Sequence, residues 1–243
     1  GALHTVQTLR AMGHKVLFLS NNPTRTIDEY VRKLDGLGLA VEPSEILTTV
    51  ETLVRWLLQH HPEATVYPIA ESPVQDALAT AGISISDDPA RIDIVIASYD
   101  RAFAYRKLQI AFDAIVVQRR AFLIATNPDR FCPFPGGRGE PDAAAIIGAI
   151  EGCTGVRCRQ VVGKPDPFML EAALQRLNLP ASACVMVGDR LSTDIRMAVD
   201  AGMDSALVLT GETTREMLEA SPIQPTRVLA RIDDLLPASL REH

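Results

Sequence analysis

The most informative pattern in the chain is an apolar run at 183–187 that stops at a glycine and an acidic residue. Such a run is typical of a strand buried on both faces of a parallel sheet. Gly188 breaks the run and Asp189 follows, so Asp189 stands at the carboxyl end of the predicted strand. Asp194 then opens a helical pattern, in a position where the helix dipole favours negative charge.

A second apolar run, Lys15–Leu19, ends in Ser20-Asn21-Asn22-Pro23. Helical patterns flank it, one over residues 3–12 and one over 26–37. A helix, a strand and a helix in this order are half of a doubly wound parallel sheet, so the sequence predicts an α/β fold.

The rest of the chain repeats this alternation. Strands are predicted at 65–70, 92–98, 121–126, 205–211 and 227–229. Helices are predicted after Thr48, at 72–81, 105–118, 141–152 and 166–177, and from Thr214 and Ile232 onward. Glycine and proline dominate Pro133–Gly139, which predicts a loop.

The α/β pattern between about residues 50 and 159 interrupts the first pattern, which resumes afterwards. We therefore predict two domains: a core domain formed by 1–49 and 160–243, and an inserted domain formed by 50–159. The inserted segment is long enough to bury a core of its own.

Composition excludes several classes of protein. The 243 residues carry a net charge of −6, which argues against an electrostatic nucleic-acid binder. No apolar run approaches the roughly 18–20 residues that a membrane span needs, and no signal-peptide pattern is visible. Cys132, Cys153, Cys158 and Cys184 are irregularly spaced, which predicts reduced thiols. We expect a cytoplasmic protein without membrane or nucleic-acid partners.

Three predicted strand ends or adjoining loops carry side chains suited to a phosphate group. Ser20 can donate to a phosphate oxygen, and the backbone amides of Asn21 and Asn22 open toward the same point. Lys164 supplies a compact positive charge, and Asp189 is a hard oxygen ligand for Mg²⁺. Carboxyl ends of parallel strands share one edge, so these groups are expected to converge.

Each of these residues also has a purely structural interpretation. Ser20-Asn21-Asn22-Pro23 fits a plain turn, and Gly163-Lys164-Pro165 fits a plain loop. Asp189 fits a turn and Asp194 a helix cap. Taken singly, each residue favours the structural interpretation, whereas the ordered set favours a phosphate site.

The chain resembles class IIA haloacid dehalogenase-like phosphatases, the NagD-like and 4-nitrophenylphosphatase-like group. The resemblance covers nearly the whole chain, and VGDRLSTDI at Val187–Ile195 is its most specific part. The other resembling pieces, in order, are LFLSNNPTRT from Leu17, ILTT from Ile46, FLIATNPD from Phe122, GGRG from Gly136, AAIIGAIEGCTG from Ala144, VVGKPDPFM from Val161 and LVLTGETT from Leu207.

The resemblance implies a Rossmann-like core with an inserted α/β cap of the C2 type. Ser20 corresponds to the second-motif hydroxyl, which binds the transferring phosphoryl group together with Asn21. Lys164 corresponds to the third-motif lysine, and Asp189 to the Mg²⁺ ligand of the fourth motif. Asp194 corresponds to its acidic neighbour, which holds either metal-bound water or Lys164 and counts as a metal-site residue.

The resemblance further implies a Mg²⁺-dependent phosphatase that acts on small phosphorylated metabolites through an aspartyl-phosphate. In the cap, Asn127, Asp129 and the loop to Gly139 correspond to the region that faces the leaving group. The substrate stays open among sugar phosphates, phosphoglycolate, pyridoxal phosphate and nucleotides. Homodimers occur among such proteins, and a homodimer is compatible with this sequence.

One departure from the family pattern is serious. The first motif, an Asp-x-Asp-Gly strand end that supplies the nucleophile and the general acid, is absent, and no acidic residue precedes Asp28. We expect that roughly 15–20 residues, a strand and a loop, precede Gly1 in the complete protein. Residues 1–243 alone are then expected to be inactive. The alternative is a non-catalytic protein of the same fold that binds phosphate and metal for regulation.

Overall fold

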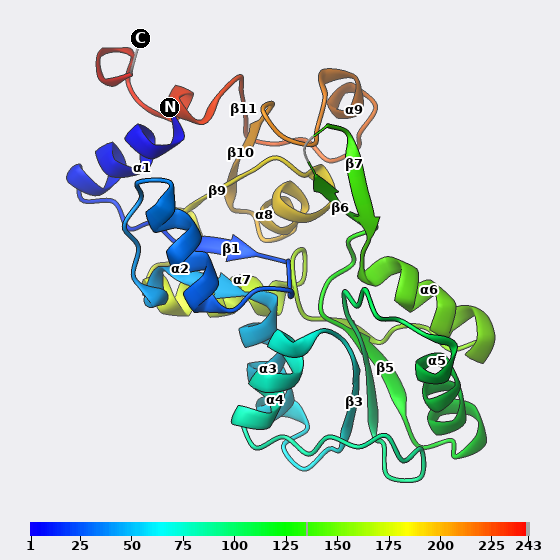
Figure 1. Ribbon diagram of the computed structural model, residues 1–243. Helices are drawn as coiled ribbons and strands as arrows, with labels where there is room; N and C mark the ends of the chain where they lie inside the picture. The colour runs from blue at the N-terminus through cyan, green and yellow to red at the C-terminus, as the bar shows by residue number, and fades with distance from the viewer. Residues whose placement is uncertain (135, 242–243) are drawn as a thin grey trace. The chain divides into compact units, whose positions relative to one another are not determined.

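The computed structural model describes residues 1–134 and 136–241, which fall into two compact units. The first unit consists of Gly1–Phe18, Asp28–Ile46 and Lys164–His243, and the second consists of Leu19–Ile27 and Leu47–Gly163. Figure 1 labels their helices and strands. Among the described residues, no helix has both the length and the apolar character needed to cross a membrane.

The first unit is built on a parallel sheet with the strand order β11-β10-β9. Asp204 of β10 pairs with Val185 of β9, and Ala206 of β10 pairs with Arg227 of β11. The strands are β9 (Val185–Gly188), β10 (Asp204–Val208) and β11 (Arg227–Leu229). The α-helices are α1 (Ala2–Ala11), α2 (Ile27–Gly36), α7 (Pro167–Leu177), α8 (Arg196–Asp200) and α9 (Arg215–Glu219).

Short helical turns complete this unit. They are η1 (Pro43–Glu45), η3 (Ala181–Ala183), η4 (Leu191–Ile195), η5 (Ile232–Leu235) and η6 (Ala238–Leu240). The turn η4 is π-helical and leads directly into α8. Buried Leu191 and Ile195 of η4 pack with Leu207 of β10, which fixes this turn against the sheet.

The second unit is built on a parallel sheet with the strand order β3-β4-β5-β8. Its strands are β3 (Val66–Ile69), β4 (Ile94–Ala97), β5 (Phe122–Ala125) and β8 (Gln160–Val161), and its helical elements are α3 (Thr49–His60), α4 (Ser72–Thr80), α5 (Tyr105–Phe112), η2 (Asp113–Val117) and α6 (Ala143–Thr154). Figure 1 shows α3 and α4 on one side of this sheet and α5 and α6 on the other. Every residue of β4 is therefore fully buried, as its continuous apolar run predicts.

Two short strands lie where the chain passes from one unit to the other. β1 (Phe18–Ser20) and β2 (Ile46–Thr48) form a two-stranded sheet. The prediction for the first of these strands was too early, because β1 begins at Phe18 rather than at Lys15. Thr48 caps α3 as expected, with its side chain accepting a hydrogen bond from the Glu51 amide.

Two other sequence predictions were wrong. Most of the predicted loop Pro133–Gly139 belongs to an antiparallel hairpin of β6 (Phe131–Phe134) and β7 (Arg138–Pro141), while residue 135 lies outside the described residues. The run at 183–187 is not buried on both faces, since Val185 is 48% exposed. In the described sheet β9 has a neighbour on one side only, β10, which leaves this side chain less covered.

Cysteine chemistry agrees with the sequence prediction. In the part of the chain that the structure describes, the four cysteines form no disulfide. Burial raises the pKa of the Cys158 thiol to about 11 and also raises the pKa of Cys184. A thiol with a raised pKa stays protonated at neutral pH and is unreactive.

The core of the second unit gives a direct test of its packing. Ile124 of β5 is fully buried, whereas Ile85 is 44% exposed. We predict that Ile124→Ala lowers the free energy of unfolding by ~2–5 kcal/mol because it leaves a cavity. The matched Ile85→Ala should stay within ~0.5 kcal/mol. Urea denaturation of both variants measures this, and equal losses would contradict the described core.

Candidate functional site

Asp189 lies directly after β9, where the chain turns toward η4. Its Oδ2 accepts a hydrogen bond from the Glu212 amide at 2.8 Å, and its carbonyl oxygen accepts one from the Thr213 amide at 3.2 Å. The segment after β10 therefore holds Asp189 in place. Gly211 permits this, because a methyl group there would lie 2.0 Å from Asp189 Oδ2.

Lys164 and Asp194 form a buried ion pair in the same unit. The Lys164 Nζ lies 2.6 Å from Asp194 Oδ1, and the two side chains are only 12% and 6% exposed. Asp194 Oδ2 also accepts a hydrogen bond from the Arg190 amide at 3.2 Å. Gly188 allows this packing, since a methyl group there would lie 2.3 Å from Asp194 Cβ. Gly188, at the end of β9, thus leaves space for the side chain of Asp194.

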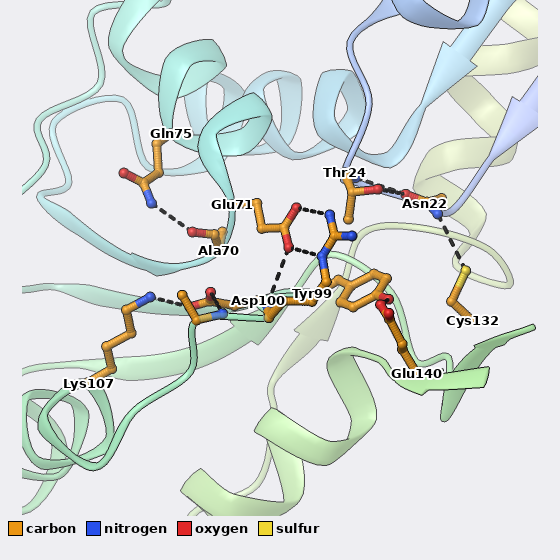
Figure 2. Close-up of polar contacts among 12 residues, drawn as sticks. Asn22, Thr24, Ala70, Glu71, Gln75, Tyr99, Asp100, Lys107, Cys132 and Glu140 are labelled. Carbon is orange, nitrogen blue, oxygen red and sulfur yellow. Dashed lines mark hydrogen bonds and ion pairs between the residues drawn. The ribbon is translucent and has the colours of Figure 1, made fainter. Parts of the chain in front are cut away.

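The end of β1 carries Ser20, Asn21 and Asn22, all in the second unit. The Asn22 amide donates to Ser20 Oγ at 3.2 Å. Asn22 Oδ1 accepts from the Thr24 amide at 2.9 Å and from Thr24 Oγ1 at 2.7 Å. This is an Asx-type turn, so the Asn22 side chain builds the loop. Its Nδ2 lies 3.6 Å from Cys132 Sγ (Figure 2).

The end of β1 contacts the polar end of β5 within this unit. Asn21 Nδ2 donates to Asp129 Oδ2 at 2.9 Å, and Asn127 Nδ2 donates to the same oxygen at 2.8 Å. Asn127 Nδ2 also donates to Asp142 Oδ1 at 3.0 Å. Asn127, Asp129 and Asp142 are all buried. Two buried carboxylates thus share one amide group, and side-chain donors satisfy them in place of water.

Gly163 lies where several strand ends meet. A methyl group at this position would lie 2.5 Å from the Thr126 carbonyl oxygen, 2.6 Å from Asn21 Oδ1 and 2.8 Å from Thr49 Oγ1. Thr49 Oγ1 in turn donates to the Thr126 carbonyl. Only glycine allows the backbone to approach these groups so closely.

A second polar cluster lies at the ends of β3 and β4, where Figure 2 shows Glu71, Tyr99 and Glu140. Arg101 Nε and Nη2 donate to the two oxygens of Glu71 at 2.6 and 2.7 Å, a bidentate pair. That hydrogen bond holds the pKa of Glu71 below its ordinary value. Tyr99 donates to Glu140, and burial together with this contact raises the pKa of Tyr99.

The structure therefore brings the predicted residues together in two groups. Asn21, Asn127 and Asp129 are joined in the second unit. Lys164 and Asp194 are joined in the first unit. Asp189 is held by the segment after β10.

Sequence reasoning missed the polar residues Glu71, Tyr99, Arg101, Glu140 and Asp142. Glu71 lies two residues after the end of β3, and Tyr99 lies two residues after the end of β4. Because ligands bind at the carboxyl ends of parallel strands, the position of these two residues in the sequence is a signal that could have identified them. Asp142 was taken only as a helix start, and it does cap α6 through the Ala143 amide.

Asp189 and Asp194 can be tested against the requirements of Mg²⁺, which needs hard oxygen ligands and is commonly bound by one or two carboxylates, waters and phosphate oxygens. Asp189 meets this requirement as a carboxylate at a strand end. Asp194 is less suited to bind the ion directly, since both of its carboxylate oxygens already accept hydrogen bonds. Among the described residues, no group of three His, Cys, Asp or Glu side chains is arranged for a metal.

Two family descriptions match the chain. Residues 1–84 match the haloacid dehalogenase-like hydrolase family, and residues 161–235 match a HAD-hydrolase-like family. The sugar-phosphatase AraL of Bacillus subtilis is 34% identical over 235 residues, covering 97% of this chain and 85% of that protein. An acid sugar phosphatase of Staphylococcus epidermidis is also 34% identical, over 86% of this chain and 79% of that protein.

Solved structures agree with these matches. The 4-nitrophenylphosphatase of Thermotoga maritima has a TM-score of 0.89 at 31% identity, covering 97% of this chain and 88% of that one. The p-nitrophenyl phosphatase of Archaeoglobus fulgidus has a TM-score of 0.87 at 32% identity, covering 96% and 89%. These similarities confirm the predicted fold class, an α/β protein with a Rossmann-like core.

The close approach at Gly163 can be tested by a single methyl group. We predict that Gly163→Ala destabilises the protein by ~1–3 kcal/mol, because the added carbon would lie within 2.8 Å of three oxygen atoms. Gly152→Ala is the matched control, since Gly152 lies in α6 with nothing near its Cβ position. The control should be neutral or stabilise by up to ~1 kcal/mol. Thermal and urea unfolding measure both, and a neutral Gly163→Ala would contradict the described packing.

The Glu71–Arg101 pair gives a pH-dependent prediction. Because folding lowers the pKa of Glu71, the pair contributes stability above its ordinary value of 4.5, and this is lost as the pH falls through the folded pKa. Glu71→Gln should therefore cost ~0.2–1 kcal/mol at neutral pH, as for a partly exposed pair. The difference from wild type should shrink below about pH 4.5. Urea unfolding at several pH values measures this difference in stability. A difference that grows as the pH falls would contradict the prediction.

Proposed function

The chain belongs to the class IIA haloacid dehalogenase-like hydrolases, and from this membership we propose that it is a Mg²⁺-dependent phosphatase of small phosphomonoesters. Its curated relatives include sugar phosphatases, and its structural relatives include 4-nitrophenylphosphatases. Sugar phosphates are accordingly the first substrates to test.

The observation that carries this proposal is the buried pair of Lys164 and Asp194 beside the strand end that bears Asp189. A structural loop lysine would lie in solvent, whereas the Lys164 side chain is only 12% exposed and its ammonium contacts Asp194. An oriented, partly desolvated positive charge is what stabilises charge on a phosphoryl group in the transition state. We therefore assign Lys164 as a phosphoryl-binding residue that Asp194 positions.

We propose that Ser20 and the backbone amide of Asn21 bind the phosphoryl oxygens, while the Asn22 amide, which donates to Ser20 Oγ, holds that hydroxyl in place. The turn that Asn22 makes with Thr24 supports this role, because it fixes the backbone after Ser20. Asn127 and Asp129 are proposed to face the leaving group. Their link to Asn21 supports this, since it ties the two segments together in one unit.

Asp189 is proposed to hold Mg²⁺, with Asp194 nearby as an outer partner. When bound, the ion neutralises charge on the phosphate and helps to orient it. The anchoring of Asp189 by the Glu212 amide supports this role, because a carboxylate fixed on one oxygen presents the other in a defined direction.

The proposed reaction is a double displacement. An aspartate carboxylate attacks phosphorus, the ester bond to the leaving oxygen breaks, and the alcohol takes a proton from a general acid. Water then attacks the aspartyl-phosphate and releases inorganic phosphate, which regenerates the carboxylate. None of the residues to which we assign a role here is proposed as that nucleophile or that general acid.

The proposed domains are a core of 1–49 and 160–243 and a cap of 50–159. The second compact unit supports the cap, since it includes Leu47–Gly163, but it also includes Leu19–Ile27, which the proposed division puts in the core. We also propose a cytoplasmic location, which the unbridged cysteines support, since thiols persist in a reducing compartment.

The second candidate is a regulatory protein that binds phosphate and metal without turnover. The roles proposed above for Ser20, Lys164 and Asp189 are binding roles, which a protein without turnover would share. The full-length protein distinguishes the two, because the regulatory protein would bind phosphate and hydrolyse no ester.

The test of the proposed function is Asp189→Asn in the full-length protein, assayed with 4-nitrophenyl phosphate and sugar phosphates. Asparagine retains an oxygen for the Glu212 amide and removes the charge that the ion needs. We predict that Mg²⁺-dependent kcat/KM falls by about 10²–10³-fold, the effect of losing one preorganised charge-stabilising group.

The matched control is Asp200→Asn, which removes an equal charge from an exposed pair with Arg196. Its activity should stay within about twofold of wild type, since exposed pairs contribute little. Thermal unfolding of both variants verifies that they are folded. Undiminished Mg²⁺-dependent turnover in folded Asp189→Asn would refute the mechanism.

A further inference from the structure

A pocket of about 440 Å³ lies in the first unit, away from every residue assigned above. Its walls include four basic side chains, Arg10, His14, Lys15 and Arg176, together with Ser44 and Glu45. Its volume lies in the range of ligand pockets, ~300–1,000 Å³.

Residues of the pocket lining precede two strands along the chain, whereas residues proposed to bind the phosphoryl group follow one of them. Val16 and Leu17 of its wall precede β1, and Ser44 and Glu45 precede β2. Ser20–Asn22, by contrast, stand at the end of β1. A ligand in this pocket would therefore not compete for the groups proposed to bind the phosphoryl group.

The charge of the pocket is unbalanced. Arg10 Nη2 lies 2.8 Å from Glu45 Oε1, which is the one carboxylate of the lining. Lys15 Nζ instead donates to the Leu177 carbonyl at 2.7 Å, and Arg176 Nη1 donates to the Ile46 carbonyl at 2.6 Å. Carbonyl oxygens orient these cations and leave their charge in place. The wall therefore keeps at least two net positive charges in a protein whose net charge is −6.

Contacts within the unit hold Arg10 in the wall of the pocket. Its Nη1 donates to the Ala40 carbonyl at 2.8 Å, and its Nη2 pairs with Glu45. A guanidinium held in this way is preorganised, so less side-chain entropy is lost when an anion binds beside it.

A purely structural role explains part of this arrangement. Lys15 on the last carbonyl of α7 satisfies the end of that helix and complements its dipole. That role accounts for one cation at the helix end. It does not account for the gathering of four basic side chains around one cavity.

We propose that this pocket is a second ligand site, which binds a small oxyanion with two or more negative charges. Guanidinium groups match the planar oxygen pairs of carboxylates and the oxygens of phosphate, and a lysine adds a point charge. A compact polycarboxylate or a phosphate group has the chemistry to fill it. The site does not depend on the proposed phosphatase activity.

The experiment is calorimetric titration of the full-length protein with citrate and, separately, with inorganic phosphate. Lys15→Glu reverses the charge of an exposed side chain in the pocket wall. Lys33→Glu makes the same change in net charge on α2, outside that wall. We expect Lys15→Glu to weaken binding of at least one anion about tenfold or more and Lys33→Glu to change it less than about twofold.

The two titrations distinguish the two ligand chemistries. Lys15-dependent citrate binding indicates a carboxylate ligand, and Lys15-dependent phosphate binding indicates a phosphate ligand. Amide NMR shifts at Gly13 and Leu177 on addition of the anion give a second measurement in the wild-type protein. The proposal is overturned if binding of neither anion depends on Lys15, or if the anion shifts neither amide.

Discussion

The first unit depends on the buried contact between an ammonium and a carboxylate. Lys164 and Asp194 are 30 residues apart in the chain, and their ion pair of 2.6 Å joins the loop after β8 to the turn after β9. Neither group is stable there alone, because removing one partner leaves an uncompensated charge out of water. Gly188 is part of the same constraint, since any side chain on it would overlap Asp194. Gly188, Lys164 and Asp194 therefore contribute to the packing of the first unit as well as to its chemistry.

In the second unit, buried carboxylates are stabilised by a side-chain amide and not by an ammonium group. Asp129 and Asp142 are both buried, and Asn127 donates to each of them. An aspartate at position 127 would place a third carboxylate there and remove both donors, whereas asparagine supplies two hydrogens from one nitrogen. Asn21 adds a donor from the end of β1. The polar side chains that end β1 and β5 therefore stabilise each other, which makes the loop geometry a property of the whole unit.

The sequence predicted the features that depend on neighbouring residues, and it did not predict the contacts between residues far apart in the chain. Continuous apolar runs predicted β3, β4 and β5 because burial on both faces is visible residue by residue. The β6–β7 hairpin was missed, since its residues are mostly exposed and its pairing rests on backbone hydrogen bonds. The partners of Asn127 and the role of Gly163 also lay beyond the sequence. Each depends on which distant strand ends meet, and local patterns do not encode that.

Polar side chains follow the strands of both units. A polar side chain at a strand end is therefore not by itself evidence of a functional site. The sheet of the second unit ends in Glu71, Tyr99 and Asn127, just as β9 ends near Asp189. Parallel strands direct polar loops to one edge in any such sheet, so the rule locates candidate residues without ranking them. What distinguishes Lys164 and Asp194 is that both partners are largely buried, whereas in the Lys107–Asp100 pair of the second unit the lysine side chain is 29% exposed. Desolvated charge therefore indicates a functional group, whereas a position at a strand end indicates only the region in which such a group can lie.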